Sequence, residues 1–83
     1  MMTKTTETTD DLAYQRPRPM SKGELARLYA PRLTDNAAVK RLMLWIDLNT
    51  ELKQQLAKAH YQKMQRIFTV RQVELIFQYL GQP

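Results

Sequence analysis

The stretch from Ser21 to Asn49 constrains the fold most, because it contains two helical patterns separated by a short break. Ser21 and Glu24 form an S-x-x-E capping box, which predicts that the first helix begins at Ser21. Pro31 ends this helix near Tyr29, since proline is incompatible with the interior of a helix. Two helices joined by a short connection predict a helix-turn-helix.

The second helix is predicted over residues 35–48, with Thr34 as its N-cap and Asp35 in its first turn. At roughly 100° per residue, its apolar positions fall on one side, which we expect to be buried. That side comprises Ala38, Val39, Leu42, Trp45, Ile46 and Asn49. The opposite side comprises Asn36, Ala37, Lys40, Leu44 and Asp47, with Arg41 at its flank.

Two further segments precede the last helix. Residues 51–59 predict a third helix, capped by Thr50 or Asn49 and buried along one stripe. That stripe comprises Leu52, Leu56 and Ala59. Residues 60–68 lose the helical period and gain Tyr, Ile and Phe, which favours a short β-hairpin or an extended segment with Lys63 near its tip.

The last helix begins at a second capping box, formed by Thr69 and Gln72, and ends at Gly81. Its core stripe comprises Val73, Ile76, Phe77 and Leu80. Leu75 and Tyr79 lie almost opposite that stripe, so either the helix is covered on two sides or these two residues form an interaction patch. The pattern predicts a small, mostly α, helix-turn-helix domain of about four helices, with a short β-hairpin wing as an option before the last helix.

The first twenty residues differ from the rest of the chain. They are rich in Thr and Pro and have no apolar period, which predicts a flexible polar tail over 1–20 and one domain over 21–83. Prolines follow Arg16 and Arg18 and keep both arginines out of the α region. Extended arginines in such an arm can reach a minor groove, although a solvated linker is the simpler interpretation.

The charge is distributed unevenly along the chain. Residues 1–13 carry one basic and three acidic residues, whereas residues 14–83 carry 12 basic and 5 acidic residues, a net charge of +7. Such an excess favours polyanionic partners, unless it serves solubility alone. The chain has no cysteine, no long apolar run and a polar start, so we expect a cytoplasmic protein without a membrane span.

The helix-turn-helix pattern points to DNA. Such a motif places the N-terminal half of its second helix in the major groove, where side chains contact base edges. The groove candidates are Asn36, Ala37, Lys40 and Arg41. Basic residues elsewhere are expected to neutralise phosphates. These are Lys22, Arg32, Lys63 and Arg66. The hypothesis is a DNA-binding accessory or regulatory protein that needs no cofactor.

A protein-interaction module is the alternative. Leu44 lies on the outward side of the second helix, and Leu75 and Tyr79 lie together on the last helix. Exposed apolar residues often mark interfaces. A DNA-binding homodimer would reconcile both hypotheses, because dimers read paired half-sites.

The sequence gives little indication of catalysis. His60 is the single histidine and follows a helix end, where a capping or surface role is the simpler interpretation. Ser21 is the single serine and already has a capping role. The sequence contains no glycine-rich phosphate loop and no metal-ligand spacing, so we expect neither an enzyme nor a metal site.

Two sequence blocks resemble a family of short uncharacterised Bacteroidales proteins classed as a domain of unknown function. The blocks are SKGELA over 21–26 and FTVRQVELI over 68–76, with Leu28-Tyr29, Leu42 and Trp45-Ile46 between them and Tyr79-Leu80-Gly81 after them. The resemblance covers about residues 18–83 and implies a compact helical domain without an assigned activity. The chain differs from the family at Val70, where Pro is common, and at Ala30, where Phe is common.

The order of elements is more distantly similar to that of excisionase and MerR-type winged-helix DNA-binding domains. In those domains a recognition helix is followed by a wing and then by a helix that opens with an aromatic-Thr pair, matched here by Phe68-Thr69. The chain departs from that order by inserting the helix predicted over 51–59. This similarity implies a winged-helix arrangement, by analogy of fold.

Overall fold

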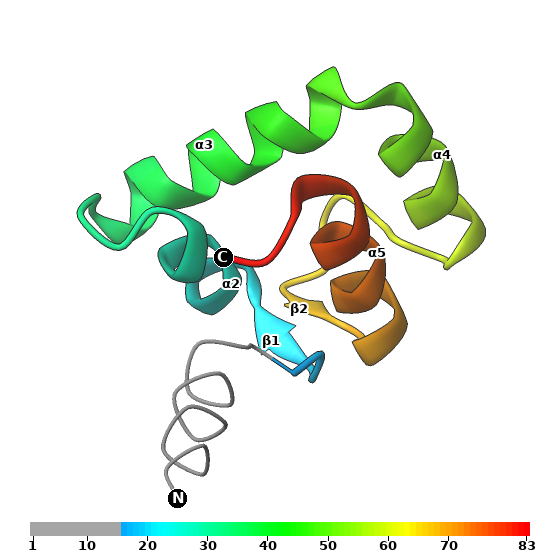
Figure 1. The fold of residues 1–83 in the computed structure, drawn as a ribbon, viewed down its shortest axis with the longest axis horizontal. Helices are drawn as coiled ribbons and strands as arrows, with labels where there is room; N and C mark the ends of the chain where they lie inside the picture. The colour runs from blue at the N-terminus through cyan, green and yellow to red at the C-terminus, as the bar shows by residue number, and fades with distance from the viewer. Residues whose placement is uncertain (1–15) are drawn as a thin grey trace, which may run out of the picture.

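The computed structural model describes residues 16–83 (Figure 1). The part of the predicted tail at positions 1–15 lies outside these residues. The elements are, in chain order, β1 (Met20–Ser21), α2 (Lys22–Tyr29), α3 (Asp35–Leu48), α4 (Thr50–Lys58), β2 (Ile67–Phe68) and α5 (Val70–Leu80). Four helices and one two-stranded sheet over residues 16–83 confirm the prediction of a small, mostly α domain.

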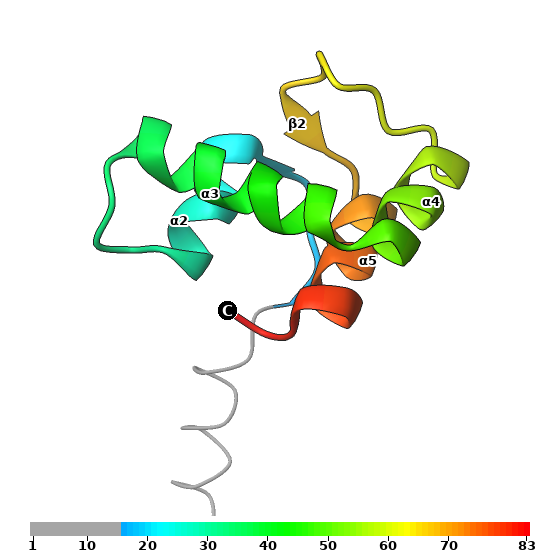
Figure 2. The same ribbon diagram turned by 90° about the horizontal axis from the view of Figure 1, so that it is seen from above.

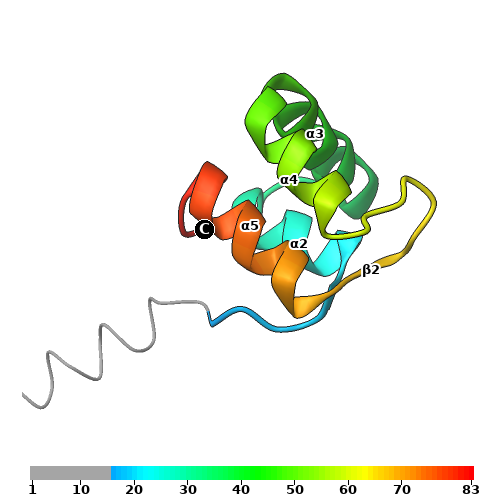
Figure 3. The ribbon, with the colours of Figure 1, turned by 90° about the vertical axis from the view of Figure 1, so that its right-hand side faces the viewer.

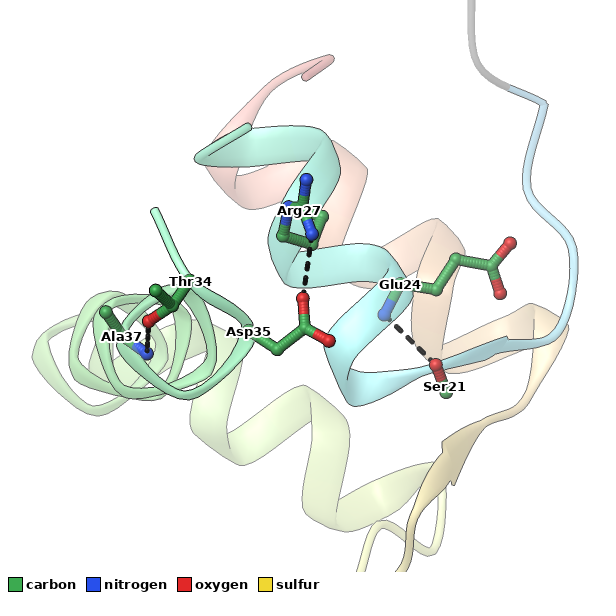
Figure 4. Close-up of polar contacts among 6 residues, drawn as sticks. All are labelled: Ser21, Glu24, Arg27, Thr34, Asp35 and Ala37. Carbon is green, nitrogen blue, oxygen red and sulfur yellow. Dashed lines mark hydrogen bonds and ion pairs between the residues drawn. The ribbon is translucent and has the colours of Figure 1, made fainter. Parts of the chain in front are cut away.

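α2 and α3 begin where the sequence predicted. The side chains of Ser21 and Thr34 each accept a hydrogen bond from a backbone N–H of the following helix, at 3.0 and 3.3 Å (Figure 4). Such caps satisfy donors that have no partner within the helix. Arg27 Nη1 lies 2.8 Å from Asp35 Oδ1, so an ion pair joins the last turn of α2 to the first turn of α3.

Glu24 departs from the predicted capping box. Its carboxylate accepts a hydrogen bond from Arg18 Nη1 at 2.8 Å, and Figure 4 shows it directed away from Ser21. Only the half of the box that Ser21 supplies is therefore formed among the described residues. The ion pair also ties Arg18, which we had assigned to the tail, to the first turn of α2.

Of the two alternatives predicted for residues 60–68, a local hairpin or an extended segment, the structure shows the extended segment, because its strand pairs outside the segment. β2 pairs antiparallel with β1, with Met20 opposite Phe68 and Ser21 opposite Ile67 (Figure 1). Met20 and Phe68 are both fully buried, so the apolar sides of two short strands supply part of the core. The folded region therefore extends before Ser21, and the residues between α4 and β2 form a loop.

Among the described helices, α5 buries the most residues. Its buried residues are Gln72, Val73, Leu75, Ile76 and Phe77. Both hydrogen bonds of the predicted capping box between Thr69 and Gln72 are present. Gln72 also donates to the carbonyl of Ala59 at 3.0 Å and accepts from Gln65 Nε2 at 2.6 Å. A single buried amide thus joins α5 to the loop that follows α4.

The burial of Leu75 corrects one predicted patch. Leu75 is 3% exposed and belongs to the hydrophobic core. The reason is that α4 packs against α5, so this helix is covered on two sides rather than one. Of the two alternatives that the sequence left open, coverage on two sides is the one observed.

The buried stripe of α3 is narrower than predicted. Ala38, Leu42 and Ile46 are buried. Val39, Trp45 and Asn49 remain partly accessible, because α3 lies along one edge of the domain (Figure 1). Trp45 instead packs edge-on against Tyr29, with ring centroids 6.2 Å apart.

Candidate functional site

The predicted groove-reading residues lie on the N-terminal half of α3. Asn36, Lys40 and Arg41 are exposed, and Ala37 is partly exposed. A helix turns about 100° per residue, so Asn36 and Lys40 share one side, whereas Arg41 projects about 100° further round. All four side chains are accessible, but they do not form one narrow stripe.

Three of the predicted phosphate contacts meet where α2 begins. Lys22 Nζ donates to the carbonyl of Lys63 at 2.7 Å, and the backbone N–H of Lys22 donates to the carbonyl of Arg66 at 3.0 Å. The Lys22 ammonium also lies 5.4 Å from the centroid of the Tyr61 ring. These contacts fasten the loop over 61–66 to α2, and Figures 2 and 3 show this loop extending beyond the helices. Arg32 lies apart, in the turn between α2 and α3.

Ion pairs divide the charged side chains of residues 16–83 into two groups. Four acidic residues are paired, as Arg18–Glu24, Arg27–Asp35, Lys53–Asp47 and Arg71–Glu74. The fifth, Glu51, lies beside the Tyr79 hydroxyl and helps to raise its pKa. None of these contacts uses a predicted DNA-binding residue. Within the described chain, the basic candidates without an acidic partner are Lys22, Arg32, Lys40, Arg41, Lys63 and Arg66.

A groove of about 690 Å³ is formed by residues of α3, α4, the start of α2 and the loop over 61–66. We call it the lysine groove. It is lined by Lys22, Met43, Ile46, Asp47, Lys53, Leu56, Ala57, Tyr61 and Lys63. The lining combines apolar side chains with three ammonium groups and one carboxylate. Lys53 and Asp47 are only loosely paired, with Nζ and Oδ1 3.9 Å apart.

Tyr61 has an unusual position in this groove. Its ring stacks on Phe68, with centroids 5.6 Å apart and an interplanar angle of 23°. Its hydroxyl is buried and has no hydrogen-bond partner, the single such side-chain group among residues 16–83. A buried hydroxyl without a partner is unfavourable by about 1–3 kcal/mol, and such groups are rare in native proteins.

The two predicted interaction patches differ in their exposure to solvent. Leu44 is 51% exposed, and Leu48, one turn further along α3, is 73% exposed. Leu75 is buried, and Tyr79 is partly buried against the core. The pKa of Tyr79 is raised, first by burial and then by the neighbouring Glu51 carboxylate. An apolar surface therefore exists on α3 but not at Leu75 and Tyr79.

Residues 16–83 contain no cluster of three or more His, Cys, Asp or Glu side chains that could hold a metal ion. None of the helices described here is long and apolar enough to cross a membrane. His60 is exposed and has a φ of 66°, in the left-handed region. Its backbone N–H donates to the carbonyl of Ala57 at 3.0 Å, so it forms part of the turn that ends α4.

Sequence reasoning missed Lys53 and Tyr61 as members of a site. It treated Lys22 and Lys63 as separate phosphate contacts, 41 positions apart, although a hydrogen bond joins them. The groove exists only because α3, α4 and the loop meet in the folded domain. The sequence contained one local signal of the groove. Lys53 and Ala57 are one helical turn apart and lie on the same side of α4 as the buried Leu56.

Residues 16–83 thus form a small four-helix domain in which the six basic side chains predicted to contact DNA have no acidic partner. The family model described as "Domain of unknown function (DUF4248)" matches residues 16–83, and the chain belongs to this family. The match begins at Arg16, in agreement with the burial of Met20 and the ion pair of Arg18. No curated protein and no solved structure matches the chain.

Proposed function

We propose that the domain is a non-enzymatic DNA-binding accessory or regulatory protein of the cytoplasm. In this proposal α3 lies in the major groove with its N-terminal half at the base edges. The turn that holds Arg32 and the loop that holds Lys63 and Arg66 contact phosphates on either side.

The separation of charges is the observation that carries the proposal. All five acidic side chains of residues 16–83 contact groups outside the predicted site, and the six basic candidates keep their charges without an acidic partner. A polyanion binds such residues without breaking an ion pair, and the release of its counterions drives association. Lys22 has one of its three ammonium donors bound to Lys63, which leaves two for a phosphate.

The arrangement of elements gives further support. α2 and α3 form a helix pair, and the loop over 61–66 leads into the β1–β2 sheet beside it (Figures 1 and 3). In a winged-helix arrangement, this sheet is the base of the wing and the loop is its tip. α4 is then an insertion between the recognition helix and the wing, and it is the point at which the chain departs from the order of elements in excisionase and MerR-type domains.

The exposed residues of α3 have the chemistry for direct reading of bases. Asn36 can pair with the N6 and N7 groups of adenine, and Lys40 can donate to the O6 and N7 acceptors of guanine. The Ala37 methyl group can contact the methyl group of thymine. Arg41 projects from another side of the helix, so we assign it to a phosphate.

Fluorescence anisotropy of a labelled random duplex, measured at several salt concentrations, tests the proposal directly. The logarithm of the association constant falls by about 0.9 per phosphate neutralised for each tenfold increase in salt. We expect a slope of about −4 or steeper. Negligible binding at low salt would contradict the proposal.

The double variant Lys40→Glu with Arg41→Glu locates the site. We expect it to abolish DNA binding and to leave the thermal melt nearly unchanged, because both side chains are exposed. The control is Lys58→Glu with Arg71→Glu, which has the same net charge but lies beside a shallow depression between α4 and α5. Equal loss of binding in both variants would mean that net charge alone matters and that α3 is not the site.

A second candidate function rests on the exposure of Leu44 and Leu48, which lie one turn apart on α3. They fit a protein interface. A homodimer that binds DNA would use both the exposed leucines and the exposed basic residues of the helix. Sedimentation of the wild type and of Leu44→Asp with Leu48→Asp tests this candidate. A self-associating wild type and a monomeric variant would favour the interface.

A further inference from the structure

The lysine groove has the size and the lining of a small-molecule site. Its volume of about 690 Å³ lies within the range of roughly 300–1,000 Å³ that is typical of ligand pockets. Met43, Ile46, Leu56 and Ala57 provide apolar contact area. Such a lining favours a ligand with an apolar body over a bare inorganic ion.

The charges around the groove define the other part of the ligand. Lys22, Lys53 and Lys63 contribute three positive charges, and Asp47 contributes one negative charge. The resulting charge of +2 is matched by a ligand group with two negative charges. A phosphate monoester and a dicarboxylate both supply such a group, with oxygens that accept from ammonium donors.

The hydroxyl of Tyr61 gives a second, independent observation. It is buried without a partner, although the ring of the same residue lines the groove. A small shift of the loop over 61–66 on binding would expose this hydroxyl to a ligand oxygen, and a hydrogen bond between the two would remove the penalty of the unpaired group. The Lys22 ammonium near the same ring places positive charge close to that position.

We propose that the lysine groove binds a small organic dianion, a phosphate monoester or a dicarboxylate, whose apolar body lies against Met43, Ile46 and Leu56. The charged end lies among Lys22, Lys53 and Lys63, and Tyr61 donates to one of its oxygens. This site is distinct from the surface of α3 that we propose contacts DNA. It shares Lys22 and Lys63 with the proposed DNA interface, so an occupied groove competes with DNA for these two ammonium groups.

Titration of the isotope-labelled full chain with 1-naphthyl phosphate, followed by amide chemical shifts, tests the proposal. We expect saturable shifts at Lys22, Met43, Asp47, Lys53 and Tyr61. Inorganic phosphate tests the need for the apolar body, and 1-naphthol tests the need for the charge. Each should bind at least about tenfold more weakly, equivalent to about 1.4 kcal/mol. Equal shifts with inorganic phosphate, or shifts confined to the outer face of α3, would overturn the proposal.

A pair of lysines on α4 provides matched variants. Lys53 lines the groove and Lys58 does not, and both are exposed, so Lys53→Glu and Lys58→Glu change the charge equally. We expect Lys53→Glu to weaken 1-naphthyl phosphate binding at least about tenfold and Lys58→Glu to leave it within about twofold. Equal affinities in the two variants would overturn the proposal.

The same two variants separate this proposal from the DNA proposal. Lys53 is not among the predicted DNA contacts, so Lys53→Glu should lower DNA affinity no more than Lys58→Glu does. Conversely, Lys40→Glu with Arg41→Glu should retain binding of 1-naphthyl phosphate. The dicarboxylate 1-naphthylsuccinate distinguishes the two ligand classes. If it binds more tightly than 1-naphthyl phosphate, the groove prefers a dicarboxylate, and if it binds more weakly, the groove prefers a phosphate monoester.

Tyr61→Phe tests the hydroxyl. The variant should fold at least as stably as the wild type, because the hydroxyl that it removes has no partner in the free domain. Its affinity for 1-naphthyl phosphate should fall several-fold. A reduced thermal stability with an unchanged affinity would show that the hydroxyl serves the fold, and would overturn its assigned contact with the ligand.

Discussion

α3 and α5 have different relations to the core. α5 buries five of its 11 residues, one of them a polar glutamine with several hydrogen bonds. α3 is longer, with 14 residues, yet it buries only Ala38, Leu42 and Ile46. Tyr29 lies between the two helices, with its ring against Trp45 of α3 and Phe77 of α5.

This difference suggests a division of roles between the two helices. Substitutions at the inner positions of α5 should mainly change stability, because seven of its 11 residues are buried or packed against the core. Substitutions on the outer side of α3 should mainly change binding, because that side contacts solvent. The predictions below test this division, from the largest expected effect on stability to the smallest.

Ile76→Ala on α5 should have the largest effect. Ile76 is fully buried, so the substitution removes apolar contacts and leaves a cavity in the core. Such changes lower the free energy of unfolding by about 2–5 kcal/mol. Urea denaturation followed by circular dichroism measures this loss, and a loss below about 1 kcal/mol would contradict the central role of α5.

Gln72→Ala should be the next most destabilising change. The amide of Gln72 accepts from the Thr69 N–H at 3.0 Å and donates to the Ala59 carbonyl at 3.0 Å, so its removal leaves both groups without these partners. The expected loss is about 2–3 kcal/mol, since each buried group left unpaired is unfavourable.

The matched control for this variant is Gln78→Ala, on the exposed side of the same helix. It should change the unfolding free energy by less than about 0.5 kcal/mol. Similar losses in the two variants would mean that the burial of the Gln72 amide contributes no more than helix propensity does.

Tyr29→Phe should alter the pH dependence of stability. Burial raises the pKa of Tyr29 to about 12 from its ordinary value of 10. Above pH 10 the unfolded chain loses the hydroxyl proton while the folded domain keeps it, so stability falls as the pH rises from 10 to about 12. Below pH 10 this contribution is constant.

The phenylalanine variant lacks this titration, so its stability should fall less between pH 10 and 12. All other titratable groups are common to both proteins, so the difference between the two curves isolates Tyr29. Parallel curves would contradict the raised pKa. Below pH 10 the variant should lose the hydrogen bond from the Tyr29 hydroxyl to the Gly81 carbonyl, a modest cost near the end of α5.

Much of the fold followed from local sequence signals. The caps at Ser21, Thr34 and Thr69 mark helix starts through side-chain hydrogen bonds that span three residues, so a short stretch of sequence contains the whole interaction. The apolar spacing of α5 likewise identified Val73, Ile76 and Phe77 as core residues.

Long-range contacts explain the errors. Met20 gave no signal as a core residue, because its burial depends on a strand residue 48 positions later, Phe68. Leu75 pointed away from the predicted core stripe, and only the packing of α4 against α5 covers it. The lysine groove was missed for the same reason, since Lys22 and Lys63 meet only through tertiary structure.

Leu48→Ala on α3 should have the smallest effect on stability. Leu48 is 73% exposed, so its truncation should change the free energy of unfolding by less than about 0.5 kcal/mol. Leu42→Ala, on the buried side of the same helix, is the control and should cost about 2–5 kcal/mol. If Leu48→Ala were also strongly destabilising, and more so at higher protein concentration, its side chain would be buried in a dimer, because a dimer's stability depends on the concentration of its subunits. The outer side of α3 would then be an interface between two copies, and the division between a stabilising α5 and a solvent-facing α3 would hold only for the monomer.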